Sequence, residues 1–312
     1  MFDLNFMNEP KLTSGTSWQP NADLISHAGS PLTIDADFFI APPPEIGELI
    51  SVATTLPTST HPLPVAIRWA IVAGSGVLLT ILFQVFVQIA VMSLLAGIVA
   101  GTIAWYFTRF NYTCSFVGIK GLARYDIAGS RSALPKESLL LFADTQNLYT
   151  RTTHNYTNGV YAGTSYSYRW IKNSGGQYEI KGTHRGEKKA PKQQDIWHFA
   201  DMGESAWTRH LLESIDDQLA RDGYIEFPLT GNLEAVRIGN GFLEFVSSKN
   251  DVQRVMRSEM QNITLGSGIF QFKHQDSRWW SGKGKFSFEY GNIPNARIFM
   301  ICLKELADIY WT

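Results

Sequence analysis

Forty consecutive residues, 69–108, carry no charged side chain, and this run limits what the chain can fold into. It lies between Arg68 and Arg109. A helix of ~20 apolar residues crosses a hydrocarbon core of ~30 Å, whereas forty residues in one helix would reach ~60 Å. The sequence therefore predicts a transmembrane helical hairpin over residues 65–109, with its turn at Phe83–Gln88. A helical hairpin buried inside a soluble protein is the alternative.

Polar and aromatic residues in the run agree with this hairpin. Gln84 and Gln88 are its only amides, and they suit a turn at the far headgroup layer. Trp69, Trp105 and Tyr106 fall at the near interface, where amphipathic rings concentrate.

Small residues in the second half of the run predict close helix packing. Gly97 and Gly101 form a Gly-x-x-x-Gly face, which lets two helix backbones approach. The packing would occur within the hairpin, between two copies of the chain, or against another membrane protein.

Charge is distributed unevenly along the chain. Residues 1–64 hold seven acids and one base, which leaves 26 bases and 21 acids in the remainder. Cytoplasmic segments next to a membrane helix carry an excess of bases. Bases near the hairpin are Arg68, Arg109, Lys120 and Arg124. The sequence thus predicts an integral protein of a bacterial inner or plasma membrane with both termini cytoplasmic and no signal peptide.

The segment 1–64 is rich in Pro, Ser, Thr and Asn. It is predicted to be largely irregular, with a folded domain as the alternative. Ile34–Ala41 is expected to be a strand or a docking segment, and Glu45–Leu56 a short amphipathic helix that Pro57 ends. Cys114 and Cys302 lie in apolar contexts and are expected to be reduced.

From residue 110 the pattern changes to short runs of period two, typical of antiparallel strands. A first domain, 110–222, is predicted to end in a helix over Gly203–Arg221, whose apolar residues recur at steps of four. Its predicted strands are Thr113–Gly118, Gly121–Ile127, Ser138–Phe142, Leu148–His154, Tyr161–Ile171, Gln177–Gly182 and Asp195–Ala200.

A second domain, 223–312, repeats this order and is predicted to end in a helix over Pro294–Tyr310. In both copies two strand aromatics precede a turn, a small residue and an amphipathic helix. The predicted strands are Tyr224–Leu229, Glu234–Ile238, Phe242–Ser247, Val252–Arg257, Gln261–Leu265, Ile269–His274 and Gly284–Tyr290.

About seven antiparallel strands followed by one C-terminal helix resemble the pleckstrin-homology-like superfold. The whole chain resembles uncharacterised bacterial membrane proteins in which a transmembrane hairpin precedes such domains. The predicted fold class is therefore α+β: a hairpin, then two antiparallel-β domains, each capped by a helix. The resemblance implies a binding or scaffolding module and brings no catalytic residues with it. The basic strand-loop motif that binds phosphoinositides in eukaryotic relatives has no match here.

Two clusters are the candidate binding residues. The stretch Lys181–Lys192 holds five bases and one acid, and would contact anionic lipid or form a solvated loop. Adjacent tryptophans in a Gly/Lys loop of the second domain would insert into headgroups or grip a partner; alternatively, one of them packs beneath the sheet. The candidates are Arg185, Lys188, Lys189, Lys192, Trp279, Trp280, Lys283 and Lys285.

No pattern typical of catalysis or metal binding occurs, so we expect no enzyme, no cofactor and no metal. No basic face interleaved with exposed aromatics indicates nucleic acid. The leading hypothesis is a non-enzymatic membrane-anchored scaffold that binds membrane lipids or a protein partner, or self-associates through its hairpin. The alternatives are a homo-oligomeric channel or pore built from the hairpins and a catalytic role at the repeat interface.

Overall fold

The protein is described by a computed structural model. The described residues are 18–20, 23–32, 36–55, 65–108, 111–128, 134–185, 196–229, 233–247, 251–277 and 284–311.

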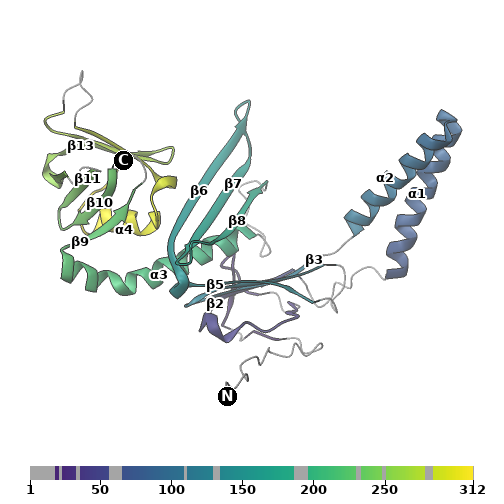
Figure 1. The fold of residues 1–312 in the computed structure, drawn as a ribbon, viewed down its shortest axis with the longest axis horizontal. Coiled ribbons are helices and arrows are strands. Elements are labelled where there is room, and N and C mark those ends of the chain that lie inside the picture. Colours follow the sequence, from purple (N-terminus) through teal and green to yellow (C-terminus); the bar gives the residue numbers. More distant parts are fainter. Residues whose placement is uncertain are drawn as a thin grey trace, which may run out of the picture.

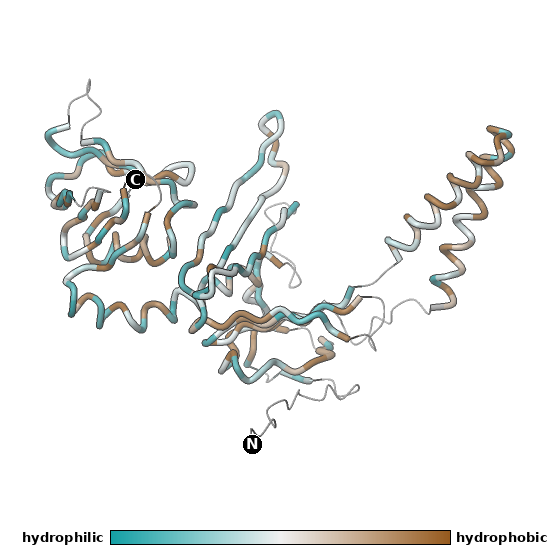
Figure 2. The backbone as a smooth tube through the Cα atoms, viewed as in Figure 1, coloured by the Kyte–Doolittle hydropathy of each residue, from teal (hydrophilic) through white to brown (hydrophobic). Residues whose placement is uncertain are grey.

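The uncharged run folds as two helices, α1 (Val65–Val87) and α2 (Ala90–Thr108), which pack against each other (Figure 1). The antiparallel helix pair predicted from the run is confirmed, and both helices are long and apolar enough to cross a membrane. The chain reverses at Gln88 and Ile89, where Gln88 has a left-handed φ of 56°. Figure 2 shows the two helices as the longest mainly hydrophobic segment of the tube.

The segment before the hairpin contributes strands to a five-stranded sheet. Its strands lie in the order β1 (Ile25–Ser26), β2 (Leu49–Thr54), β3 (Asn111–Gly118), β4 (Gly121–Ala128) and β5 (Lys136–Leu141). The amphipathic helix expected over Glu45–Leu56 is wrong. A 3-10 turn, η1 (Pro44–Ile46), ends at Gly47, whose φ is 74°, and β2 then pairs antiparallel with β3.

A small core under this sheet explains the strand. Val52 of β2 is fully buried together with Phe38 and Phe116, and Trp18 packs edge-on against both phenylalanines. Burying these aromatics stabilises an extended segment that its local sequence does not specify. Residues 34 and 35 of the expected Ile34–Ala41 segment lie outside the described residues; Ala36 and Phe38 are buried.

A second sheet and a long helix complete the first half. The sheet has the order β6 (Thr145–Thr157), β7 (Val160–Lys172) and β8 (Gln177–His184). The strand expected over Asp195–Ala200 is wrong, because α3 (Ile196–Asp222) begins there. Its buried positions Phe199, Gly203, Ala206 and Trp207 follow helical spacing, whereas Trp197 and Phe199 alone had suggested period two.

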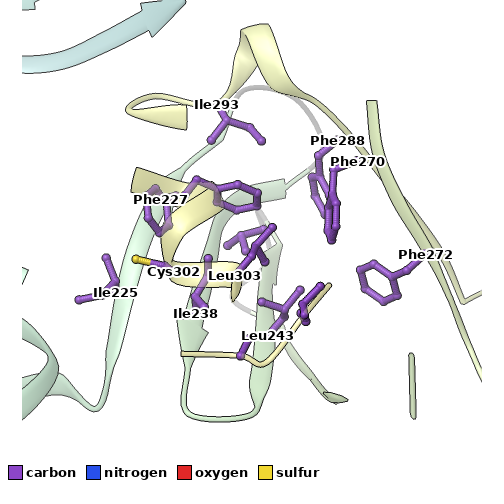
Figure 3. Packing of buried hydrophobic residues seen from close by; sticks show 14 of the residues in the cluster. Ile225, Phe227, Ile238, Leu243, Phe270, Phe272, Phe288, Ile293, Cys302 and Leu303 are labelled. Atoms are coloured by element: carbon purple, nitrogen blue, oxygen red, sulfur yellow. The ribbon is translucent and has the colours of Figure 1, made fainter. Parts of the chain in front are cut away.

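The second half contains two sheets around its own core. One sheet has the order β12 (Val252–Met256), β11 (Phe242–Ser247), β10 (Leu233–Gly239) and β9 (Tyr224–Pro228), and the other β13 (Met260–Gly266), β14 (Ile269–His274) and β15 (Lys285–Glu289). The final helix is α4 (Ala296–Glu305). Figure 3 shows Cys302 and Leu303 of α4 among the buried side chains of the strands, which include Ile225, Ile238 and Leu243.

The two halves have the same order of elements. Each has four meandering strands, then three, then a helix: β2–β5, β6–β8 and α3, followed by β9–β12, β13–β15 and α4. In the first half, β2 takes the place of the strand expected over Asp195–Ala200 and is the first of the seven strands. Since β2 precedes α1 and β3 follows α2, the helical hairpin is inserted between the first and second strands of the first copy.

Helix α3 belongs to both cores. Its Ala206 and Trp207 are buried in the first core, and Ile215 and Leu219 pack against the second. At ~1.5 Å per residue its 27 residues span ~40 Å. A single helix therefore contacts the cores of both halves (Figure 1).

Candidate functional site at the base of the hairpin

The hairpin is held together by the close approach of its two backbones. A Cβ atom at Gly97 would collide with the Thr80 hydroxyl and lie 2.7 Å from the Gly76 carbonyl oxygen. At Gly101 the nearest atom would be the Val72 carbonyl oxygen at 3.5 Å. The structure therefore places Gly97 at the tightest point between α1 and α2, with Gly101 at ordinary contact distance. Both glycines face α1 of the same chain.

The outer surface of the hairpin is apolar and has little protein against it. Ser93 and Gly97 are the buried residues of α2, and α1 has none among its described side chains. Phe86 and Phe107 are each about four-fifths exposed. Contiguous apolar surface on this scale marks a site that another apolar phase covers.

The two helices are tied together where they leave the sheet. The Arg68 guanidinium donates to the Thr108 hydroxyl at 3.3 Å and to the Trp105 carbonyl at 3.4 Å, and lies 5.5 Å from the centre of the Trp105 ring. Below this point Thr55 continues the β2–β3 pairing: its amide donates to the Thr113 carbonyl at 3.0 Å. The sheet and the hairpin are therefore joined at the end of the β2–β3 pair, which we call the base of the hairpin.

A cavity of about 440 Å³ opens at this base. One part of its lining consists of neutral hydroxyl and amide groups; another is apolar. The polar residues are Thr54, Thr55, Asn111, Thr113, Ser115 and Thr183, and the apolar ones Ala53, Tyr166, Ile196 and Phe199. Its remaining lining residues are His27 and Arg124.

Arg124 does not make the cavity strongly basic. Its Nε lies 2.9 Å and its Nη2 2.9 Å from the two carboxylate oxygens of Asp126, and the Thr113 hydroxyl donates to the same carboxylate at 2.8 Å. This bidentate pair satisfies both charges within the wall. The cavity therefore suits neutral, hydrogen-bonding groups better than a free anion.

His27 closes the inner end of the cavity. Its Nδ1 lies 2.8 Å from the Ser51 hydroxyl of β2, and its Nε2 lies 2.8 Å from the Ser115 hydroxyl of β3. Burial, and secondly repulsion from His198, lowers the pKa of His27 to about 3, so the ring is neutral. This arrangement pins β2 and β3 together through the His27 ring.

A second polar cluster joins the two halves of the chain. The Asn295 carboxamide oxygen accepts from the Leu148 amide at 2.9 Å and from Trp207 Nε1 at 2.8 Å. The backbone N–H of Asn295 in turn donates to the Leu148 carbonyl oxygen at 2.7 Å. Beside it Arg297 lies 2.7 Å from the Ser205 hydroxyl and 3.7 Å from the Glu204 carboxylate. β6, α3 and α4 meet at this cluster.

Burial raises the pKa of Glu204 to about 7, although Arg297 lowers it in part. The negative charge of Asp201 raises the pKa further. Glu204 is thus the carboxyl at the contact between the halves that changes charge near neutral pH.

The binding residues predicted from the sequence lie mostly outside the described part of the chain. Lys188, Lys189, Lys192, Trp279, Trp280 and Lys283 are in this group. Arg185 is exposed just after β8, and Lys285 is exposed at the start of β15, opposite Lys273. Their roles in binding remain predictions.

Sequence reasoning missed both the cavity and the Asn295 cluster. The cavity draws on residues from 27 to 199, and the cluster joins residues 147 positions apart, so no local spacing indicates either. Within the described ranges no group of three or more His, Cys, Asp or Glu side chains is placed to hold a metal ion.

Comparison with known proteins assigns no family to the chain. No protein-family model matches the chain, and no curated protein sequence is significantly similar to it.

Proposed function

We propose that this chain is a non-enzymatic integral membrane protein, in which the hairpin anchors two pleckstrin-homology-like domains at the cytoplasmic face. The domains bind a protein partner or the anionic leaflet, so the molecule acts as a membrane-anchored scaffold. The supporting fold evidence is the four-strand, three-strand, helix order of each half. That order fits the superfold, which presents surfaces for binding.

One observation carries the proposal: the helical hairpin is inserted between β2 and β3, which pair with each other. Thr54 and Cys114, the last paired residues of β2 and β3 on this side, face each other directly. Both ends of the hairpin therefore emerge at the same end of two neighbouring strands and on one side of the membrane. The sheet is consequently held close to the bilayer rather than at the end of a long linker.

The native mass of the full-length protein, gently extracted from its own membranes, tests this function. A scaffold is expected as one or two copies that carry a second polypeptide or retained anionic lipid. A closed ring of identical copies with nothing else bound would replace the scaffold by a pore built from the hairpins.

The tryptophan pair provides a sharper test of binding. Changing Trp279 and Trp280 together to Ala is expected to reduce retention of the bound polypeptide or lipid, because aromatic anchors contribute most to such contacts. The matched control is Tyr310→Ala, which removes an exposed aromatic elsewhere in the same half. Equal retention by a folded double variant and by the control would contradict the assignment of these residues.

A further inference from the structure

The β6–β7 hairpin extends well beyond the sheet to which it belongs. β8 ends at His184, which pairs with Thr164 of β7. Beyond that pair, the strand partners of β6 and β7 among the described residues are each other, up to the closing pair Thr157 and Val160. We call residues 155–163 the ribbon. Figure 1 shows the ribbon as a finger that rises from the body of the molecule.

The sequence determines the turn and the bulge at the end of the ribbon. Asn158 and Gly159 have φ values of 52° and 79°, as a two-residue type I′ turn requires. Asn155 pairs with Gly163 but Tyr156 pairs with Tyr161, so Ala162 is the extra residue of a bulge. The bulge lies just past the end of β8 and sets the direction of the tip.

The tip exposes apolar surface without any charge. Tyr156 is 64% exposed and Val160 is 70% exposed. The 17 residues from 152 to 168 contain no Asp, Glu, Lys or Arg, although 18% of the chain is charged and about three such residues would be expected. A two-stranded ribbon in water is marginally stable, and exposed strand edges usually carry charges that prevent association. This composition indicates that the surface of the ribbon is partly shielded from water when the protein functions.

The position of the ribbon favours a bilayer as the covering phase. In Figure 1 the ribbon and the α1–α2 hairpin project from the same side of the β2–β5 sheet. Tyrosine concentrates at the headgroup level, where its ring is apolar and its hydroxyl remains hydrated. The unpaired edge of β6 excludes deeper insertion, because strand edges are not tolerated in hydrocarbon.

We propose that the tip of the ribbon, Tyr156–Val160, rests in the headgroup layer of the leaflet that the hairpin enters. This inference relies on the proposed membrane-spanning role of α1–α2. The tip then acts as a second support beside the hairpin and fixes the tilt of both halves above the bilayer.

Fluorescent labelling of single cysteines in the full-length protein tests this contact. The native thiols of Cys114 and Cys302 are buried, and burial raises the pKa of each to about 12, so they react poorly. An environment-sensitive dye is attached to Val160→Cys in vesicles of phosphatidylcholine and phosphatidylglycerol, with and without lipids that carry a headgroup-level spin quencher. Val252→Cys, half exposed on β12, is the matched control, and Leu78→Cys reports on the hairpin itself.

The expected result is a blue-shifted, lipid-quenched dye at position 160, a water-exposed dye at 252, and a dye at 78 quenched by spin labels deep in the acyl chains. Quenching at 78 with a water-exposed dye at 160 would overturn the ribbon contact alone. A dye at 160 that is blue-shifted yet not quenched by lipid would also overturn it and assign the ribbon to a second protein copy. Absence of lipid quenching at both 78 and 160 would overturn the membrane-spanning role as well.

Discussion

Asn295 adopts a left-handed backbone conformation, φ 54°, at the point where the two halves of the chain touch. Asparagine tolerates this conformation better than other residues that carry a Cβ atom. The same conformation directs its side chain toward two donors, the Leu148 amide and Trp207 Nε1. Asn295 thus has two roles: it adopts a left-handed backbone conformation, and it accepts hydrogen bonds from two donors. Substitutions can remove one role without the other.

Asn295→Ala is expected to lower the free energy of unfolding by about 2–4 kcal/mol, because it leaves two donors unpaired and adds left-handed strain. Asn295→Gly is expected to lower it less, since glycine removes only the hydrogen bonds. Urea unfolding followed by tryptophan fluorescence measures both. Asn292→Ala, which loses one exposed hydrogen bond to Glu289, is the control, and an equal loss in all three variants would contradict the role of Asn295.

Glu204 makes the contact between the halves sensitive to pH. Its pKa of about 7 in the folded protein exceeds its ordinary value of 4.5, so the folded state binds the proton more tightly than the unfolded state. The free energy of unfolding that depends on this group therefore falls as pH rises from about 4.5 through 7. At about 1.4 kcal/mol per pKa unit, the fall is on the order of 3–4 kcal/mol.

Glu204→Gln is expected to remove this fall, because the amide does not titrate. Urea midpoints of the native and variant proteins at pH 5 and pH 8 provide the measurement. Glu305→Gln, exposed at the end of α4, should keep the native pH dependence. Identical pH dependence in the native protein and Glu204→Gln would show that another group is responsible.

At the scale of elements, the chain divides into parts whose structure follows from local sequence and parts that depend on distant contacts. The hairpin follows from composition alone, because forty uncharged residues must form helices in an apolar phase. Other strands follow from period-two patterns, as in β14, whose burial alternates and whose observed bounds equal the predicted ones. Such elements can be predicted without knowing which residues pack against them.

Other elements were missed for physical reasons. β2 is a strand because Val52 enters a core supplied by Phe38 and Phe116, which lies 64 positions away. The first two turns of α3 contain Trp197 and Phe199 at strand-like spacing, and only the burial of Ala200 and Gly203 selects the helix. The cavity at the base of the hairpin depends on both elements, so its lining was equally inaccessible to sequence reasoning.

Gly97 gives an element-scale prediction. Gly97→Leu is expected to separate α1 from α2, because its Cβ would collide with Thr80 and the Gly76 carbonyl. Disulfide formation between Val72→Cys and Gly101→Cys, which approach each other across the hairpin, reports on the packing. The cross-link should decrease strongly with Gly97→Leu. Gly74→Leu is the control, because a Cβ at Gly74 meets no atom within 4 Å; equal cross-linking with both would contradict this contact.

At the scale of the whole molecule, the insertion of the hairpin into a sheet predicts a single topology. Leu134 and Tyr310 are exposed in different halves, and Gln88 lies at the turn of the hairpin. A membrane-impermeant maleimide added to intact cells should label Gln88→Cys and leave Leu134→Cys and Tyr310→Cys unlabelled. Permeabilisation should expose both of the latter. Labelling of Leu134→Cys from outside intact cells would refute the cytoplasmic placement.

The position of β2 also constrains how the protein is made. β2 leaves the ribosome before α1, but its neighbour β3 is synthesised only after α2, 57 residues after β2 ends at Thr54. Given the proposed membrane-spanning role of α1 and α2, the first sheet cannot close until both helices have entered the bilayer and returned the chain to its starting side. Correct insertion becomes a precondition for folding of the first half. A chain that fails to insert exposes an unpaired β2 and open core, which cellular quality control can recognise.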